Sequence, residues 1–342
     1  MAEYCSIHRI INGDVIIDIS SHQLARILMP SPTPNETIAA EVVASMTQEK
    51  VLSSIRMTTG DQYFVFDIKT VHAEYVIRMT DKAHRNNFIT AIYWQNMLLP
   101  LGIPLAKFIS SDLDGQHSPF PSLLMNRLAG SDLCNIYSEL TDSDKRNLAQ
   151  EMINIQALTH VLPDGKGYGI TPSYEQITAD NSWYDFLMNR LNLFKDIIRK
   201  NGIYDERNVD KVIALGKNME NELRTIPARP FLWDASERNV IINKGQITGI
   251  VDVDDMCFGD PLLVIALTSI ALEVDGHDTL YTDYWAEGLQ LGAKAQHRLD
   301  FYRLFYTVVF MRKHAMTTTN AKKVVFDKQL LQDMFNRLAS KL

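Results

Sequence analysis

The sequence predicts an α+β fold with two lobes, a small antiparallel β-sheet lobe followed by a larger, mainly helical lobe. Three stretches between residues 48 and 80 have the pattern of strands, the third with clear alternation of inward and outward residues. From residue 142 onward, apolar residues instead recur at helical spacing. A chain of 342 residues is long enough to bury a large core and to form two lobes.

We divide the chain into an N-terminal extension (1–35), a small lobe (36–128) and a large lobe (129–342). The proline-rich stretch 30–34 breaks regular structure and has the composition of a linker. Helical spacing begins directly after it, at 36–46. The sequence indicates no role for the extension.

The strands of the small lobe are predicted at 51–57, 63–68 and 74–79. Gly60 lies between the first two, in a turn that needs glycine. A helix follows at 86–99, where apolar residues mark one face.

A further strand is predicted at 122–130, where the chain leaves the small lobe. Amphipathic or apolar helices are then expected in the large lobe. They span 142–159, 182–200, 205–224, 262–272, 279–289 and 299–314.

Composition excludes several classes of protein. The formal charge of −7 and pI near 5.7 argue against a nucleic-acid binder, which would present a basic face. Cys5, Cys134 and Cys257 are scattered thiols, which favours a reducing compartment and neither a disulfide framework nor a zinc site. The longest apolar run, 262–272, is too short to span a bilayer, and the N-terminus lacks a signal sequence. We therefore expect a cytoplasmic protein without nucleic-acid or membrane partners.

The most informative stretch of the chain is 231–261, which alternates short apolar runs with polar turns. Strands at 240–242 and 247–251 are predicted to form a hairpin. Gly245 can supply the positive φ that the connecting turn requires.

Polar side chains flank this hairpin on both sides. Asp234 and Asn239 precede it, and Asp252 stands where the second strand ends. The five-residue spacing of Asp234 and Asn239 is that of the kinase catalytic loop, in which the Asp orients the acceptor hydroxyl and the Asn holds magnesium. Asp252 is then a second metal ligand. The alternative for each residue taken singly is a turn cap.

Together with Gly259-Asp260-Pro261, these residues resemble the aminoglycoside phosphotransferase and choline kinase family, which has a protein-kinase-like fold. That family usually reads His-Gly-Asp-x-x-x-x-Asn, then Ile-Asp-Trp, then Gly-Asp-Pro. The resemblance is specific because three elements occur in order at the right separations. The chain departs from the pattern at Leu232 and Trp233, which stand in place of the His and Gly.

The resemblance implies an ATP site in the small lobe. Arg78 occupies the position of the family's strand Lys or Arg, which contacts the nucleotide phosphates, and arginine can do so with two parallel hydrogen bonds. The turn at Gly60 would cover the phosphates with backbone N–H groups. Backbone groups of Met125, Asn126 and Arg127 would read the adenine edge. An exposed strand arginine is the alternative for Arg78.

Other family positions differ in this chain. Ala91 stands where a Glu usually pairs with the strand Lys, and Glu74 or Asp81 are open as substitutes. Gln156 replaces a frequent His. The helical region 173–226 corresponds to one wall of the family's acceptor pocket.

The resemblance implies a small-molecule kinase that transfers the γ-phosphate of ATP to an acceptor hydroxyl. Asp234 would be the catalytic base, Asn239 and Asp252 would hold Mg²⁺, and Arg78 would bind phosphate. The alternative is a pseudokinase-like nucleotide-binding protein with reduced chemistry, which the departures from the family pattern favour.

An acidic run follows the hairpin. From Asp252 to Glu287 there are nine Asp or Glu residues and no Lys or Arg. If some of them line the cleft, they favour a cationic acceptor over an anionic one. A solvated acidic face is the alternative. The sequence indicates neither the identity of the acceptor nor the oligomeric state.

Overall fold

The computed structural model describes residues 33–57, 62–176, 180–317 and 323–342. Residues Asn35–Leu342 form one compact unit. Most of the predicted extension and linker, and the predicted turn at Gly60, lie outside the described residues.

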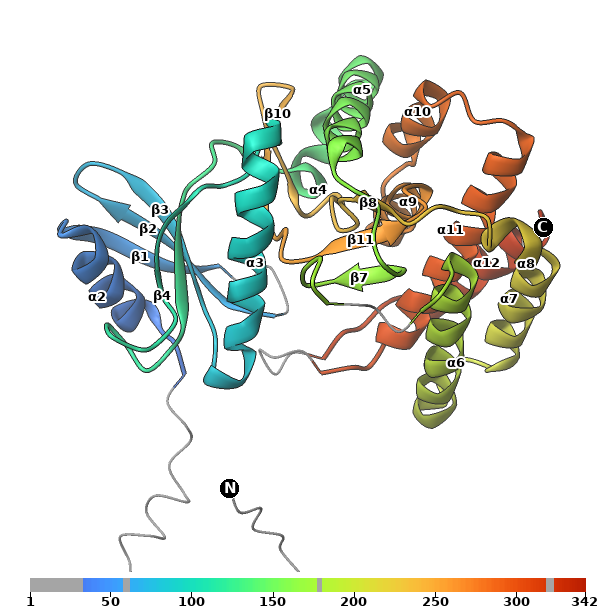
Figure 1. Cartoon of the computed structure of the whole chain (residues 1–342), viewed down its shortest axis with the longest axis horizontal. Helices are drawn as coiled ribbons and strands as arrows, with labels where there is room; N and C mark the ends of the chain where they lie inside the picture. Colours follow the sequence, from blue (N-terminus) through green and yellow to red (C-terminus); the bar gives the residue numbers. More distant parts are fainter. Residues whose placement is uncertain (1–32, 58–61, 177–179, 318–322) are drawn as a thin grey trace, which may run out of the picture. The chain divides into compact units, whose positions relative to one another are not determined.

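The small lobe is built on a five-stranded antiparallel sheet in the order β1-β2-β3-β5-β4 (Figure 1). Its strands are β1 (Val51–Met57), β2 (Phe64–Thr70), β3 (Glu74–Met79), β4 (Phe108–Asp112) and β5 (Ser122–Asn126). The three strands predicted before residue 80 are confirmed. The strand predicted at 122–130 ends early, at Asn126.

Two helices pack on this sheet. Helix α2 (Glu36–Thr47) begins at Asn35, whose side chain accepts a hydrogen bond from the N–H of Ile38 at 3.0 Å. Its buried residues Ala39, Val42 and Val43 pack with apolar side chains of β2 and β3. Helix α3 (Arg85–Leu98) contributes Phe88 and Ala91 to a separate cluster with Leu123 of β5.

The large lobe is mainly helical. Its helices are α4 (Leu133–Ile136), α5 (Asp142–Leu158), α6 (Trp183–Asn201), α7 (Arg207–Asn218), α8 (Glu220–Leu223), α9 (Leu262–Val274), α10 (Leu280–Gly288), α11 (Ala293–Lys313) and α12 (Lys328–Ala339). Short 3-10 turns are η1 (Lys82–His84), η2 (Leu99–Leu101), η3 (Tyr137–Glu139) and η4 (Thr159–Val161). The prediction of a single helix at 205–224 is wrong, because the helix is interrupted at Met219, between α7 and α8.

The large lobe also contains two small sheets of three strands each. One has the order β10-β9-β6 and the other β7-β11-β8. Their strands are β6 (Ser131–Asp132), β7 (Gly169–Thr171), β8 (Arg229–Phe231), β9 (Val240–Asn243), β10 (Gln246–Ile250) and β11 (Met256–Gly259). The β9–β10 hairpin is confirmed, and Lys244 and Gly245 form its turn with φ of 51° and 75°. The patterns do not predict β6, β7, β8 or β11, because runs of two to four residues show too little alternation.

Gly259, in the predicted Gly-Asp-Pro element, cannot be replaced by a larger residue without a clash. Its φ is 153°, and an added Cβ would lie 2.1 Å from the indole of Trp183. Asp260 accepts a hydrogen bond from the N–H of Leu262 at 3.1 Å and forms an ion pair with Arg298. The element therefore anchors α9 to α6 and α11.

None of the helices in the described ranges combines the length and the apolar character needed to cross a bilayer.

Candidate active site

The loop between β8 and β9 is held together by its own hydrogen bonds. Asn239 donates from Nδ2 to the carbonyl oxygen of Asp234 at 2.9 Å, and the Ser236 hydroxyl is 3.5 Å from Oδ1 of Asp234. The N–H of Val251 donates to the carbonyl oxygen of Asn239 at 2.9 Å. This last bond joins the start of the hairpin to the residue before Asp252, so the three predicted residues are connected.

Asp252 and Asp234 influence each other electrostatically. Burial, and then the negative charge of Asp252, raise the pKa of Asp234 to about 8. Burial also raises the pKa of Asp252 to about 6, although the charge of Arg78 opposes the rise. Asp252 has a φ of 60°, a left-handed conformation that non-glycine residues adopt rarely and often at functional sites.

Gln156 fixes the loop at the position where the family pattern has a His. The N–H of Leu232 donates to Oε1 of Gln156 at 3.1 Å, and Nε2 of Gln156 donates to the carbonyl oxygen of Leu232 at 2.9 Å. Both residues are buried. A buried amide that satisfies both backbone groups holds the strand end directly before Asp234. Leu232 stands where the family pattern has a His, and here its backbone is held by Gln156 of α5.

Arg78 is buried and paired, which excludes the exposed strand arginine as an explanation. Its Nη1 donates to Oδ1 of Asp254 at 2.9 Å, and its Nη2 pairs with the other oxygen of the same carboxylate. Nη2 also lies 3.0 Å from Oδ1 of Asp252. The guanidinium stacks 4.2 Å from the ring centroid of Tyr63, whose hydroxyl donates to Asp254 at 2.6 Å.

Asp254 is the partner of Arg78 that the sequence analysis missed. It supplies the carboxylate that Ala91 cannot, and neither proposed substitute does so. Glu74 pairs with Lys69 at 3.8 Å, and Asp81 pairs with His84 at 2.8 Å. The sequence did contain one signal: Asp254 follows Asp252 by two residues, the spacing that puts two side chains on one side of an extended chain.

Two backbone N–H groups of the predicted adenine-binding segment already donate hydrogen bonds within the protein. The N–H of Asn126 donates to the carbonyl oxygen of Lys107, and that of Arg127 to the carbonyl oxygen of Glu74, both at 3.1 Å. Met125 pairs within the sheet between β3 and β4. These two N–H groups therefore have partners inside the protein, and contact of this segment with adenine stays a prediction.

Most carboxylates of the acidic run form ion pairs with basic residues outside the run. Such pairs are Asp254–Arg78, Glu273–Arg337, Asp275–Arg238, Asp278–Lys145, Asp283–Arg303 and Glu287–Arg146. Carboxylates that are neutralised in this way do not give a cleft a negative field. The run therefore carries no argument for a cationic acceptor.

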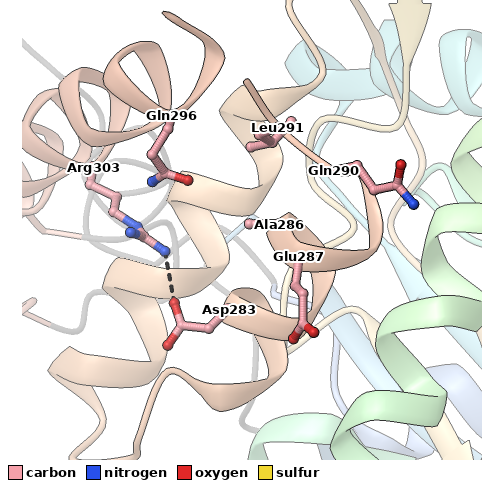
Figure 2. Close-up of a pocket in the computed structure, with 7 residues that line it drawn as sticks. All are labelled: Asp283, Ala286, Glu287, Gln290, Leu291, Gln296 and Arg303. Atoms are coloured by element: carbon pink, nitrogen blue, oxygen red, sulfur yellow. Dashed lines mark hydrogen bonds and ion pairs between the residues drawn. The ribbon is translucent and has the colours of Figure 1, made fainter. Parts of the chain in front are cut away.

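A pocket of 390 Å³ lies on the large lobe, apart from the residues described above (Figure 2). Its lining residues come from α10, α11 and the segment between them: Asp283, Ala286, Glu287, Gln290, Leu291, Gln296 and Arg303. Figure 2 shows Arg303 directed at Asp283, with which it forms an ion pair at 3.1 Å. None of the predicted site residues lines it, and it indicates no role in the chemistry.

The donor atoms of the site suit a hard cation. Asn239 donates through Nδ2 to the carbonyl oxygen of Asp234, which leaves its Oδ1 free to bind a cation. Mg²⁺ takes oxygen ligands and is commonly held by one or two side chains plus substrate phosphates. No group of three or more His, Cys, Asp or Glu able to hold a metal occurs in the ranges that the structure describes. An amide oxygen and a carboxylate are donors of the kind that hold Mg²⁺ together with substrate phosphates.

Comparison with known proteins identifies relatives of the chain. The sequence profile of the phosphotransferase enzyme family matches residues 56–302. A probable ketoamine kinase of Staphylococcus aureus is 25% identical over 179 residues, which are 50% of this chain and 60% of that protein.

Solved structures share the fold. Aminoglycoside phosphotransferase APH(4)-Ia superposes with a TM-score of 0.62 at 13% identity, covering 90% of this chain and 99% of its own. A putative fructosamine-3-kinase from Haemophilus somnus 129PT gives 0.61 at 16% identity, covering 88% and 96%. The gentamicin complex of APH(2")-IIa gives 0.62 at 14% identity, covering 90% and 97%. The expected fold, a small antiparallel sheet lobe with a larger helical lobe, is confirmed.

Proposed function

The chain belongs to the phosphotransferase enzyme family, and from this premise we propose that it transfers the γ-phosphate of ATP to a hydroxyl group of a small-molecule acceptor. The observation that carries the proposal is the connection of Asp234, Asn239 and Asp252 through the β9–β10 hairpin. The name of the ketoamine kinase relative and the family assignment support a small-molecule acceptor.

Asp234 is the proposed base. It orients the acceptor hydroxyl and accepts its proton as the new P–O bond forms. Burial, and then the charge of Asp252, raise the pKa of this carboxyl to about 8 in the metal-free site, and only the ionised carboxylate can accept the proton. Trp233, the neighbouring half-buried residue, packs against the core of the large lobe.

Asn239 and Asp252 are the residues that would hold Mg²⁺ through Oδ1 and a carboxylate oxygen. When bound, the cation neutralises charge on the phosphates of the nucleotide. Asp252 is 37% exposed at its side chain, so its carboxylate remains accessible although Arg78 lies beside it.

Arg78 binds phosphate oxygens, and Asp254 holds its guanidinium in place. Two hydrogen bonds from one carboxylate and stacking on Tyr63 fix the plane of the guanidinium. Arginine that is already ordered loses little side-chain entropy when it binds the nucleotide.

Two substitutions separate metal binding from phosphoryl transfer. Asp252→Ala should abolish Mg²⁺-dependent ATP binding, because it removes the carboxylate ligand. Asp234→Asn is nearly isosteric and should bind MgATP as the wild type does. Its transfer rate should fall by about 10²–10⁴-fold, because an amide cannot accept the proton. Binding is measured by calorimetry, and transfer by ADP release across a panel of hydroxyl acceptors.

Asp333, an exposed residue of α12, provides the matched controls Asp333→Ala and Asp333→Asn, which should leave both measurements unchanged. Absence of MgATP binding by the wild type would overturn the proposal. If the wild type binds MgATP and Asp234→Asn matches it in every assay, the protein is a nucleotide-binding pseudokinase.

A further inference from the structure

Two arginines of the large lobe have no negatively charged partner among the residues that the structure describes. Arg190 lies in the middle of α6, and Arg312 lies in the last turn of α11. Both are half-buried, and the Nε atom of each is buried without a hydrogen-bond partner in the described part of the chain. Burial, and then the positive charge of Arg190, lower the pKa of Arg312, so the two guanidinium groups lie near each other.

Aromatic rings position both groups. Helices α6 and α11 pack side by side (Figure 1). The guanidinium of Arg190 lies 4.5 Å from the ring centroid of Phe186, and that of Arg312 lies 4.9 Å from the centroid of Phe194. Phe186, Arg190 and Phe194 follow one another at four-residue intervals and therefore share one face of α6. Phe305 of α11 contacts Phe194 at 5.9 Å between centroids, which joins the two helices at this point.

The arrangement differs from that of Arg298 and Arg303, two other half-buried arginines of α11. Arg298 pairs with Asp260 and Glu222, and Arg303 pairs with Asp283 and Asp300. Among the described residues Arg190 and Arg312 have no such pair.

Folding gains little from two like charges that are half-buried together. Like charges at short distance repel, and partial burial weakens their hydration. The dipole of α11 favours a cation in its last turn and so accounts for Arg312, but Arg190 is far from either end of α6. Such a pair is expected where a protein binds an anion.

Residues beside the pair lie within electrostatic range of the proposed base. Tyr306 of α11 is buried and lies within electrostatic range of both Asp234 and Arg190. Lys313, next to Arg312, lies within electrostatic range of Asp234 and opposes the rise of its pKa.

We propose that Arg190 and Arg312 bind an anionic group of the acceptor, a carboxylate or a phosphate, while its hydroxyl lies at Asp234. This inference rests on the proposed function and names the chemical class of its substrate. Guanidinium groups suit carboxylate and phosphate because they donate parallel hydrogen bonds. The proposal reverses the earlier expectation of a cationic acceptor. That expectation depended on the acidic run, whose carboxylates are mostly paired with basic residues of the protein.

Inorganic phosphate is the first probe, because it is small enough to bind without matching the rest of an acceptor. The full chain is saturated with Mg²⁺ and AMP-PNP, so that the nucleotide site is occupied, and titrated with phosphate at constant ionic strength. Wild type should bind phosphate, and Arg190→Gln and Arg312→Gln should each weaken binding by about tenfold or more. Arg229→Gln, at an exposed arginine of β8, is the control and should bind as wild type does. Absence of binding by the wild type, or equal binding by all variants, overturns the proposal.

Thermal stability separates ligand binding from packing. Without phosphate, Arg190→Gln should leave Tm unchanged or raise it, because one of two repelling charges is removed. If the arginines serve only to pack on Phe186 and Phe194, Tm should fall while phosphate affinity is retained, and that result contradicts the proposal.

Turnover with matched acceptors distinguishes this inference from the proposed function. Hydroxy acids and sugar phosphates should be phosphorylated faster than the corresponding polyols and amino alcohols, and Arg312→Gln should remove the preference by raising KM. Transfer only to neutral or amine-bearing acceptors would leave the proposed function standing and this inference wrong. If MgATP does not bind, the proposed function fails. The phosphate titration is then repeated without nucleotide, with the two arginine variants as reference.

Discussion

Arg78 stands between two carboxylates of one short segment, Asp252 and Asp254, and has different relations to each. Asp254 binds it with two hydrogen bonds and is itself almost buried. Asp252 contacts it at one point and keeps part of its carboxylate exposed. The geometry thus assigns the anchoring of the arginine to Asp254 and leaves Asp252 able to bind a cation.

At this scale we predict that Arg78→Ala lowers the free energy of unfolding as well as ATP affinity. Removing one partner of a buried ion pair leaves an uncompensated charge on Asp254 and costs about 3–5 kcal/mol. Urea unfolding of Arg78→Met, Asp254→Leu and the double variant should show strong coupling between the two sites. Additive effects in this cycle would contradict the anchoring role.

The matched comparison for Arg78 is Arg85, which pairs with the exposed Asp114 at 2.7 Å. Because exposed pairs contribute about 0–1 kcal/mol, Arg85→Met should change stability little and leave ATP affinity unchanged.

Among the secondary-structure elements, the turn that ends β4 depends on a single carboxylate. The oxygens of Asp112 accept hydrogen bonds from the N–H groups of Gly115, Gln116, His117 and Ser118, at 2.7–3.3 Å. Burial by itself would raise the pKa of Asp112, but these four donors outweigh it and lower the pKa below its usual value. The ionised carboxylate therefore orders the connection between β4 and β5.

We predict that Asp112→Asn destabilises the protein at pH 7 by about 1.5–3 kcal/mol, the range for hydrogen bonds to a charged group. A lowered folded pKa means that this stabilisation is complete above the unfolded pKa of about 4 and is lost as pH falls through the folded value. Unfolding curves of wild type and variant from pH 7 to pH 3 should therefore converge at the acidic end. Asp114→Asn, an exposed change in the same turn, should show no such convergence.

Across the molecule, helix α3 joins the two lobes of the unit Asn35–Leu342. Phe88 and Ala91 pack with Leu123 of the small lobe, whereas Trp94 and Leu98 belong to the core cluster of the large lobe. Nε1 of Trp94 donates to the carbonyl oxygen of Thr171 at 3.1 Å. One rigid helix that contributes to both cores makes separate unfolding of either lobe costly.

We predict one cooperative unfolding transition for this unit. Far-UV circular dichroism and tryptophan fluorescence should give the same midpoint, and saturating MgATP should raise both together. A first transition in which the small-lobe strands exchange amide hydrogens while Trp94 stays buried would show that the lobes are independent.

Local patterns in the sequence predicted much of the fold and part of the site. The strands at 51–57 and 74–79 match β1 and β3, since periodicity and turn residues act over a few positions. The spacing of Asp234 and Asn239 predicted a connected loop for the same reason, because their hydrogen bond is local. Boundaries were less accurate where tertiary contacts end an element, as at Asn126 and Met219.

The sequence by itself determined the α+β class, the β9–β10 hairpin and the residue types of the proposed metal site. Only the tertiary structure decided which side chains meet across long separations. Arg78 and Asp254 are 176 residues apart, and Gln156 and Leu232 are 76 apart. The physical reason is that periodicity reports which face of an element is buried, whereas the partner of a buried charge or amide depends on how whole elements pack. Arg78 is neutralised by Asp254, and not by Glu74 or Asp81, because the small lobe packs against the large lobe at this point.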